Sequence, residues 1–342
     1  MSAATYRQDH PRRGVVCFSR TLESRLAHPN RRFIMSRVSA TASVVAVLAA
    51  LASIPAQAVQ RAFVASYGND ANTATNCGFT NPCRGFTAAQ TVTDPNGEIV
   101  ALDAAGYGAV TIVKSITITA NPGFYAGIAA STGNAVTIAT AGVNVILRGL
   151  NINGVGATDG IRMTNGTSLS VENCVVSNFT NNGIWVTTAA RVRVSDSLVR
   201  GNTLDGIALE AGATGSVVRT KANAQGRSGI ISQGTVAAVT TTVSVSDSDA
   251  SGNAYGLVAY STVATAIGRI SASHVSATNN SFAGVSTQGT ADTAVSIGSS
   301  LVTGNSQGLA NSGGGTFESL GNNLVRQNGS NTSGTITTVS GI

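Results

Sequence analysis

Charged side chains are scarce in this chain of 342 residues. Asp, Glu, Lys and Arg together make up 11% of it, whereas globular domains carry about 25%. Aromatic residues are also few, at 5%, and there are only three His and one Trp. This scarcity of charge, with a hydrophobic content of 42%, excludes an intrinsically disordered chain. Glycine is abundant, at 39 residues, and together with many small and β-branched residues it favours short strands joined by tight turns.

The N-terminal region contains an apolar run, Val44 to Ile54, that is too short to cross a bilayer, which needs about 20 residues. The run follows the basic residue Arg37 and precedes Ala56-Gln57-Ala58, the pattern of small residues at a signal-peptidase site. We therefore expect a signal peptide over residues 35–58, and no transmembrane segment in the mature chain. An uncleaved membrane anchor is the alternative.

The basic charge of the chain lies mostly in this leader. Residues 1–34 hold seven arginines and no clear pattern, and they are interpreted as an upstream extension. Without residues 1–58 the chain loses eight basic and two acidic residues, which leaves thirteen of each sign. The isoelectric point of 9.5 is therefore no sign of a nucleic-acid partner, because such a partner requires a basic patch on the folded domain.

Three cysteines follow the leader: Cys77, Cys83 and Cys174. In an oxidising compartment Cys77 and Cys83 are close enough in sequence to close a small loop, so we expect a disulfide between them. Two free thiols are the alternative, and Cys174 would remain unpaired. We expect a protein that is secreted, periplasmic or held at the cell surface.

Internal repetition is the strongest pattern in the sequence. A glycine followed by an aliphatic residue recurs seven times, at spacings of 23, 23, 23, 27, 28 and 24 residues. Between these marker glycines lies a second recurring unit of alternating aliphatic residues, two small polar residues, an aliphatic residue and Asn. The marker pairs are Gly160-Ile161, Gly183-Ile184, Gly206-Ile207, Gly229-Ile230, Gly256-Leu257, Gly284-Val285 and Gly308-Leu309.

Alternation with a period of two directs one side of each short strand inward. Gly and Asn bend the chain because they accept positive φ. Three strands and three bends in about 23 residues make one triangular coil, and stacked coils pair strand on strand. Two inward stacks are expected: Ile161, Ile184, Ile207 and Ile230 in one, and Val171, Val194 and Val245 in the other.

The sequence therefore predicts an all-β protein, a single-stranded right-handed parallel β-helix of about nine or ten coils over residues 96–328. A leucine-rich repeat is the main rival at this period, but it would need dominant Leu and a helical side to each unit. Residues 59–95 are expected to form an N-terminal cap with the disulfide loop and a short helix, Arg84 to Thr91, whose Phe86 covers the first coil. Residues 329–342 form a tail rich in Ser, Thr and Gly.

The marker glycines and the Asn residues that precede them resemble those of the pectin-lyase-like superfamily of right-handed β-helices. These Asn residues are Asn178, Asn202, Asn253, Asn280 and Asn305. The segment from Gly68-Asn69-Asp70 through Asn81-Pro82-Cys83-Arg84-Gly85-Phe86 also resembles the start of secreted bacterial β-helix repeat proteins of unassigned activity. The resemblance implies the fold. It does not imply one reaction, because the superfamily includes lyases, hydrolases, tailspikes and adhesins.

The lyases of this superfamily use acidic calcium ligands with a basic proton abstractor, and its hydrolases use clustered aspartates. In this sequence the residues expected at matching coil positions are Asn173, Asp196, Thr220 and Asp247, with Arg219 close by in register. Asp196 and Asp247 would lie two coils apart, about 10 Å. This distance slightly exceeds the separation of about 6.5–9.5 Å between the carboxylates of inverting glycosidases. The two aspartates are candidate catalytic carboxylates, with Arg219 as the basic partner. The alternative is turn chemistry, because Asp and Asn favour bends.

Asp247 and Asp249 also match the opening of a calcium loop, but Val258 stands where the loop needs a bidentate Glu. This excludes an EF-hand. No cofactor is expected, although simple calcium capture by these two aspartates remains open.

Trp185, the single Trp, lies between the inward residues Ile184 and Val186 and should point outward, with Arg162 at the same position one coil earlier. An exposed Trp beside an Arg could stack on a sugar and hydrogen-bond its hydroxyls. Stacking of the Arg on the indole itself is the alternative. A further polar column is expected from Asp159, Asn182 and Asp205, each of which precedes a marker glycine.

Three functions follow from these observations. The first is a non-enzymatic extracellular or surface protein that contacts a polysaccharide or a host-surface glycan. The second is a polysaccharide lyase or glycoside hydrolase with an unusual site, and the third is a purely structural scaffold. Few charges, and a single His after the leader, favour the first and the third.

Overall fold

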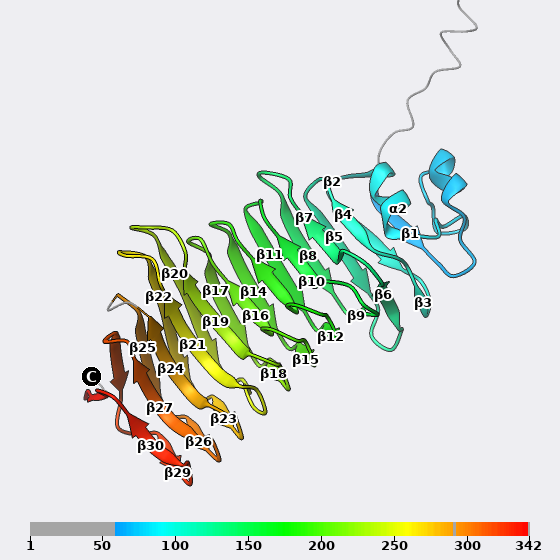
Figure 1. Ribbon diagram of the computed structural model, residues 1–342. Helices are drawn as coiled ribbons and strands as arrows, with labels where there is room; N and C mark the ends of the chain where they lie inside the picture. Colours follow the sequence, from blue (N-terminus) through cyan, green and yellow to red (C-terminus); the bar gives the residue numbers. More distant parts are fainter. Residues whose placement is uncertain (1–58, 290–291, 341–342) are drawn as a thin grey trace, which may run out of the picture. The chain divides into compact units, whose positions relative to one another are not determined.

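The computed structural model describes residues 59–289 and 292–340. The predicted upstream extension and signal peptide, residues 1–58, lie outside the described residues. In the described part the chain winds into a right-handed parallel β-solenoid of about nine turns (Figure 1) with only two helices, as the repeat predicts. No helix in this part is long and apolar enough to cross a membrane.

Most turns of the solenoid contribute one strand to each of three parallel sheets, here named A, B and C in the order in which the chain passes through them. Sheet A has twelve strands. They are β1 (Val59–Val64), β2 (Thr93–Ala101), β5 (Ile116–Ala120), β8 (Asn144–Arg148), β11 (Ser168–Glu172), β14 (Arg191–Ser195), β17 (Thr214–Val218), β20 (Thr240–Ser246), β22 (Ile267–Ser273), β25 (Ala294–Gly298), β28 (Thr316–Ser319) and β31 (Thr337–Thr338).

Sheet B is divided into runs of six and three strands, with Asp249 bridging the gap between Lys221 and Ser276. Its strands are β3 (Ala105–Gly106), β6 (Ala126–Ala130), β9 (Leu150–Gly154), β12 (Val175–Ser177), β15 (Leu198–Arg200), β18 (Lys221–Asn223), β23 (Ser276–Thr278), β26 (Leu301–Thr303) and β29 (Leu324–Arg326).

Sheet C has ten strands and carries the candidate site described below. Its strands are β4 (Val110–Ile112), β7 (Asn134–Ile138), β10 (Asp159–Met163), β13 (Ile184–Val186), β16 (Ile207–Leu209), β19 (Ser228–Gly234), β21 (Tyr255–Ser261), β24 (Ala283–Gly289), β27 (Gln307–Ser312) and β30 (Ser330–Ser333). Strands β30 and β31 lie within residues 329–340, so the sheets continue into the Ser/Thr/Gly-rich segment.

The inward stacks predicted from the repeat are present in the core. Ile161, Ile184, Ile207 and Ile230 pair in register along sheet C and are fully buried. In sheet A the corresponding stack is Val171, Val194, Val217 and Val245. Because each coil is one strand thick, these side chains are shielded from water only when neighbouring coils stack above and below them.

The sequence suggested that the marker glycines are needed because they accept positive φ. The structure shows instead that they are needed because the backbones of successive coils approach each other closely. Gly183, for example, does not have positive φ. A Cβ there would lie 2.5 Å from Cγ1 of Val199 and 2.7 Å from the carbonyl oxygen of Gly206. The backbones of successive coils therefore leave no space for a side chain at this position.

A ladder of amide side chains, buried except for the half-buried Asn328, marks the bend from sheet B to sheet C. Each side-chain oxygen accepts the backbone N–H of its equivalent one coil earlier, as between Asn280 and Asn253 at 2.9 Å. The ladder members are Asn202, Gln225, Asn253, Asn280, Asn305 and Asn328. Asn178 is not a member, because Phe179 occupies its place in the ladder.

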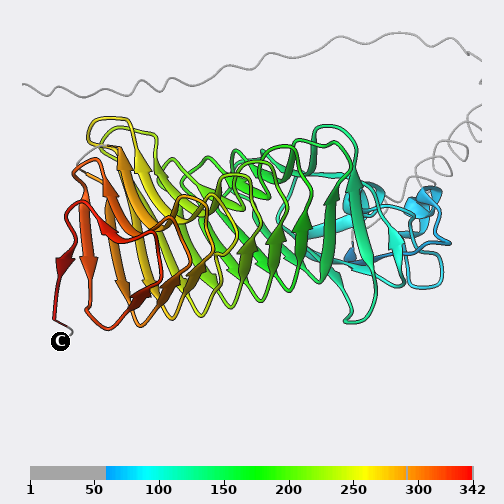
Figure 2. The same cartoon turned by 60° about the horizontal axis from the view of Figure 1, so that its bottom comes forward.

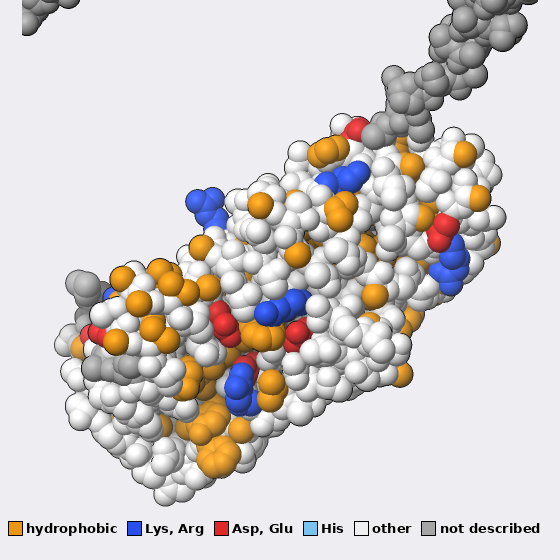
Figure 3. All heavy atoms as spheres, turned by 45° about the horizontal axis from the view of Figure 1, so that its top comes forward, with side chains coloured by type: hydrophobic (Ala, Val, Ile, Leu, Met, Phe, Trp, Pro, Cys, Tyr) orange, Lys and Arg blue, Asp and Glu red, His pale blue; other side chains and the backbone are white. Residues whose placement is uncertain are grey.

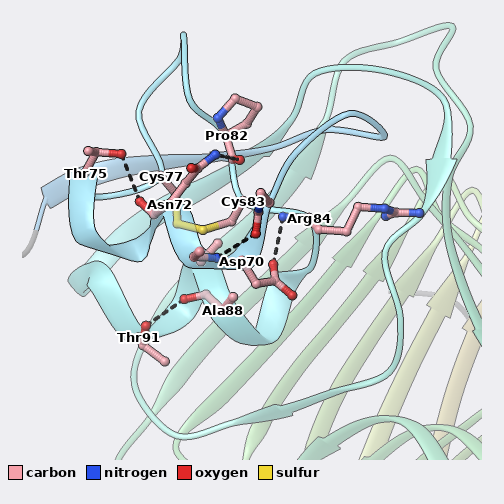
Figure 4. Close-up of a disulfide and its surroundings, with 12 residues drawn as sticks. Asp70, Asn72, Thr75, Cys77, Pro82, Cys83, Arg84, Ala88 and Thr91 are labelled. Atoms are coloured by element: carbon pink, nitrogen blue, oxygen red, sulfur yellow. Dashed lines mark hydrogen bonds between the residues drawn. A yellow bond between two sulfur atoms is a disulfide. The ribbon is translucent and has the colours of Figure 1, made fainter.

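The N-terminal end of the solenoid carries the predicted helix and disulfide. Helix α2 (Phe86–Val92) begins two residues later than predicted, because one carboxylate oxygen of Asp70 accepts the backbone N–H groups of Arg84 and Gly85. The Cys77–Cys83 disulfide is confirmed (Figure 4), and the helix η1 (Asp70–Thr75) precedes it. Phe86 is fully buried and packs against Tyr107, as expected for a residue that covers the first coils.

Candidate functional site

The outward face of sheet C carries one residue per coil at its centre, in register along the solenoid axis. Thr111 and Thr137 come first in this series, and we call the part of it from β10 to β27 the floor row. It begins with charged and aromatic residues and continues with small and apolar ones. Its members are Arg162, Trp185, Ala208, Ile231, Val258, Ser286 and Ala310.

Arg162 and Trp185 meet at the N-terminal part of the floor row, as the sequence predicted. The Cζ atom of Arg162 lies 3.2 Å from the centroid of the Trp185 ring, so the guanidinium covers one face of the indole. The indole Nε1 donates a hydrogen bond of 2.8 Å to Glu210. The arrangement is the cation–π stack that the sequence left as the alternative. Sugar contact by this pair stays a prediction, and the face of Trp185 under Arg162 is not open to a ligand.

Burial controls the ionisation of the groups around this stack. It raises the pKa of Glu210, although the hydrogen bond from Trp185 and the charge of Arg162 act in the opposite direction. It also lowers the pKa of Arg162, although Asp159 and Glu210 act in the opposite direction. Nη1 of Arg162 is buried without a hydrogen-bond partner among the described residues. The cation is therefore held by the aromatic ring and by long-range attraction to two carboxylates.

The predicted polar column of Asp159, Asn182 and Asp205 lies beside the floor row. Oδ1 of Asp159 accepts the backbone N–H of Asn182 at 3.0 Å, and Oδ1 of Asn182 accepts that of Asp205 at 3.2 Å. The carboxylate of Asp205 is completely buried and binds Arg227 through both oxygens, with 2.9 Å between Nε and Oδ1. The column therefore fixes backbone geometry and places one paired Arg at the edge of the floor row.

Further along the floor row, two adjoining pockets of about 420 and 310 Å3 open on the outward face of sheet C. We call them together the axial groove. Ile231 and Val258 face outward but are buried, because Tyr255 and Tyr260 pack against their cluster. Tyr255, Tyr260 and Gln288 line both pockets. The remaining lining residues include Arg227, Gln233, Phe282, Ser286, Gln307 and Ala310.

The aromatic rings of the axial groove form a small exposed platform. The rings of Tyr255 and Phe282, from neighbouring coils, stack at 5.3 Å between centroids with 15° between their planes, and Phe282 as a whole residue is 57% exposed. Figure 3 shows hydrophobic side chains beside side chains of both charges midway along the solenoid. An exposed aromatic cluster on an otherwise polar surface is typical of a binding site.

Sequence reasoning missed these three aromatic residues. Two features of the sequence could have indicated the tyrosines. Tyr255 directly precedes the marker Gly256, and Tyr260 lies two residues after Val258 in the same strand, so the two side chains point to the same outward face. Phe282 lies two residues before Gly284. Their convergence depends on the register between coils of 27 and 28 residues, which the sequence alone leaves open.

The candidate catalytic residues lie elsewhere, at the bend from sheet A to sheet B. Asp196, Arg219 and Asp247 occupy equivalent positions in three successive coils, all with positive φ. The prediction that Thr220 holds the middle position is wrong by one residue. Thr220 is buried, and its hydroxyl oxygen accepts the backbone N–H of Ser197.

Arg219 therefore lies between the two aspartates and binds Asp196 through two hydrogen bonds of 2.7 and 2.9 Å. These hydrogen bonds lower the pKa of Asp196 and raise that of Arg219. Both side chains are well exposed. The three residues form a row of alternating charge on the surface, and their catalytic role stays a prediction.

Asp247 and Asp249 belong to different parts of this bend. The carboxylate of Asp249 accepts hydrogen bonds from Asn223, at 2.9 Å, and from the hydroxyl of Ser251. Within residues 59–289 and 292–340, no group of three or more His, Cys, Asp or Glu side chains could hold a metal ion. Calcium binding by the two aspartates would have only these two carboxylates as acidic ligands, and it stays a prediction.

A further pocket, of about 490 Å3, lies on the outward face of sheet A near its N-terminal end. It is lined by charged residues, among them Arg61, Glu98 and Arg148, together with Phe63 and Phe79. Arg61 pairs with Glu98 at 2.8 Å, and Arg148 pairs with Glu172 at 2.9 Å. The two faces thus differ in character: sheet A offers paired charges and the axial groove offers mainly aromatic and amide side chains.

Comparison with known proteins agrees with this architecture. Residues 134–329 match the family profile described as right handed beta helix region. A pectate lyase structure has a TM-score of 0.58 and 16% identity over 82% of this chain and 78% of its own. The A-module of a mannuronan C-5 epimerase from Azotobacter vinelandii has a TM-score of 0.55 and 17% identity over 69% of this chain and 72% of its own. These likenesses establish the fold alone, and no curated protein sequence matches the chain significantly.

Proposed function

Because the chain belongs to the right-handed β-helix family, we propose that it is a non-enzymatic, extracellular carbohydrate-binding protein that holds a glycan in the axial groove of sheet C. The observation that carries the proposal is the cluster of Tyr255, Tyr260 and Phe282 around the groove. Aromatic rings offer flat apolar surfaces that stack on sugar rings at low entropic cost. Amide and hydroxyl groups in the same groove can exchange hydrogen bonds with sugar hydroxyls.

Two further observations support an extracellular, carbohydrate-related role. The Cys77–Cys83 disulfide suits an oxidising compartment. The two solved structures with the same fold are enzymes named for pectate and mannuronan, which are both polysaccharides. Carbohydrate is therefore the ligand class that fits both the fold and the chemistry of the groove.

Binding rather than catalysis is proposed because the carboxylates beside the groove already have partners. Asp205 is buried against Arg227, and Glu210 accepts the indole N–H of Trp185. A general acid or base must reach the proton that it transfers. Neither carboxylate belongs to the residues that line the two pockets.

The alternative is a polysaccharide lyase or glycoside hydrolase that uses Asp196, Asp247 and Arg219. A panel of polysaccharides, with and without calcium, separates it from the proposal. Product would be detected by the absorbance of unsaturated ends and by a reducing-end assay. We expect no product from the wild-type protein. Activity that disappears in Asp196→Ala would replace the proposal with the enzymatic alternative.

Affinity electrophoresis tests the binding proposal directly. The protein is run through native gels that contain neutral or acidic polysaccharides. We expect retardation in at least one of them, and a loss of affinity of roughly tenfold or more in Tyr260→Ala, which corresponds to about 1.4 kcal/mol. Tyr125→Ala is the matched control, because Tyr125 is an exposed tyrosine beside sheet B. Unretarded wild-type protein in every gel, or equal losses in the two variants, would refute the proposal.

A further inference from the structure

We infer that the axial groove takes a neutral glycan, without carboxylate groups, whose chain lies along the solenoid axis across successive coils. This inference rests on the proposed function and adds the class of ligand and its direction. It follows from which residues form the two sides of the groove and from how its charges are paired.

The direction follows from the register of sheet C. Tyr255 of β21 and Phe282, next to β24, lie at the start of their strands, on one side of the floor row. Gln233, Tyr260 and Gln288 pair with one another at the other end of β19, β21 and β24. The open space between these two sides therefore crosses the strands. From β19 to β27 it spans three strand spacings, roughly 14 Å at about 4.8 Å each, which is long enough for an oligosaccharide.

The charge of the groove disfavours an acidic ligand. Among the described residues that line the two pockets, Arg227 is the only charged one, and Asp205 holds it through both carboxylate oxygens. A uronate carboxylate entering here would lose water without gaining a free cation, which is costly. Asp205 is buried directly behind Arg227, so the local charge offers no net attraction for an anion.

Neutral hydroxyl groups, in contrast, find suitable partners in the groove. Ser, Gln and Tyr side chains both donate and accept hydrogen bonds, as sugar hydroxyls do. The phenol hydroxyls of Tyr255 and Tyr260 have no hydrogen-bond partner among the described residues. Among the described residues, the side-chain amide of Gln288 makes one hydrogen bond, in which its Nε2 donates to the hydroxyl of Ser286 at 3.1 Å. These groups point to a ligand that is rich in hydroxyls and carries no charge.

The test compares gels that contain neutral polymers, galactomannan and xyloglucan, with gels that contain polygalacturonate or alginate, each at low and high salt. We expect retardation by a neutral polymer that does not change with salt, that falls roughly tenfold or more in Tyr260→Ala and Phe282→Ala, and that persists in Tyr125→Ala. Affinity for oligosaccharides of that polymer should rise with length up to the few sugars that roughly 14 Å can hold.

A matched pair of variants tests the charge argument. Gln288→Lys places a cation in the groove and should add salt-sensitive binding to polygalacturonate, whereas Gln288→Glu should not. If the wild-type protein binds the acidic polymers more tightly than the neutral ones, the inference is wrong and the proposed function stands. If it binds none of the polymers, both are wrong. Affinity that does not depend on oligosaccharide length would overturn the direction along the axis.

Discussion

Two Asp–Arg pairs on the outer surface differ in how far water reaches them. The carboxylate of Asp205 is fully buried behind Arg227, whereas the side chains of Asp196 and Arg219 are 44% and 56% exposed. Water screens an exposed pair, so such a pair adds little stability. A buried carboxylate that also accepts backbone N–H groups, as Asp205 does from Ser228, contributes more.

We therefore expect Asp205→Ala to lower the free energy of unfolding by about 2 kcal/mol, because Arg227 and the N–H of Ser228 would both lose a charged partner. Asp196→Ala should leave it nearly unchanged. Urea denaturation followed by circular dichroism measures both variants. Equal losses would mean that burial does not distinguish the two pairs.

Asp159 gives stability a defined pH dependence. Burial raises its pKa above the ordinary 3.8, against the hydrogen bonds from Asn182 and the charge of Arg162. The folded protein therefore holds this proton more tightly than the unfolded chain does. The resulting stabilisation is complete below pH 3.8 and is lost as the pH rises through the raised, folded-state pKa.

Asp159→Asn keeps an acceptor oxygen in the column and removes the titration. We expect this variant to gain stability over the wild-type protein as the pH rises from 3.8 toward neutrality, measured by urea denaturation across that range. Asp196→Asn is the control of opposite sign. Arg219 lowers the pKa of Asp196, so the small stabilisation that this exposed pair contributes is present above pH 3.8 and is lost as the pH falls. If the difference in unfolding free energy between Asp159→Asn and the wild-type protein does not change with pH, Asp159 is not the source of the pH dependence.

At the scale of structural elements, the amide ladder joins the coils where sheet B bends into sheet C. Asn280 accepts the N–H of Asn253 and donates to the carbonyl oxygen of Ala250, at 3.1 Å, and to Asn305. The side chain is buried. Its removal would leave several backbone and side-chain groups without partners and without access to water.

Asn280→Ala is therefore expected to cost about 3 kcal/mol of stability, measured as the shift in urea midpoint at constant slope. Ser281→Ala, at the exposed neighbouring position, is the matched control and should behave as the wild-type protein. A loss below about 1 kcal/mol in Asn280→Ala would show that the bend is held mainly by packing.

At the scale of the described molecule, the two ends of the solenoid are built differently. The N-terminal end carries α2, η1 and the disulfide, whereas the last described strands at the opposite side, β29, β30 and β31, are short and their residues are mostly exposed (Figure 2). In a stack of repeats, stability arises from contacts with neighbouring coils. A coil whose residues are mostly exposed has few such contacts and is therefore the first to open.

We expect amide hydrogen exchange to be fastest in β30 (Ser330–Ser333) and β31 (Thr337–Thr338). It should be slowest in central strands such as β13 (Ile184–Val186) and β16 (Ile207–Leu209). Mass spectrometry of peptic fragments after timed exchange measures the gradient. Uniform protection along the solenoid would indicate that it opens as one unit instead.

The sequence by itself determined the solenoid, its coil length, the inward isoleucine stack and the disulfide. Gly160, Gly183, Gly206 and Gly229 repeat every 23 residues, and the same local pattern recurs because each coil meets the same constraint: a neighbour above, a neighbour below and no room for a Cβ. A disulfide six residues apart needs only the local chain. Such features depend on periodicity or on contacts between residues that are close in sequence, and both can be recognised in the sequence itself.

Only the tertiary structure decided which outward side chains meet. Arg219 rather than Thr220 lies between the two aspartates, and Arg162 stacks on Trp185, where the sequence had left open whether this pair contacts a sugar instead. The axial groove forms where coils of unequal length bring Tyr255 and Phe282 together. The physical reason is that outward residues are not restricted by the core. Their neighbours depend on the exact register between coils, and that register is fixed only when the coils stack.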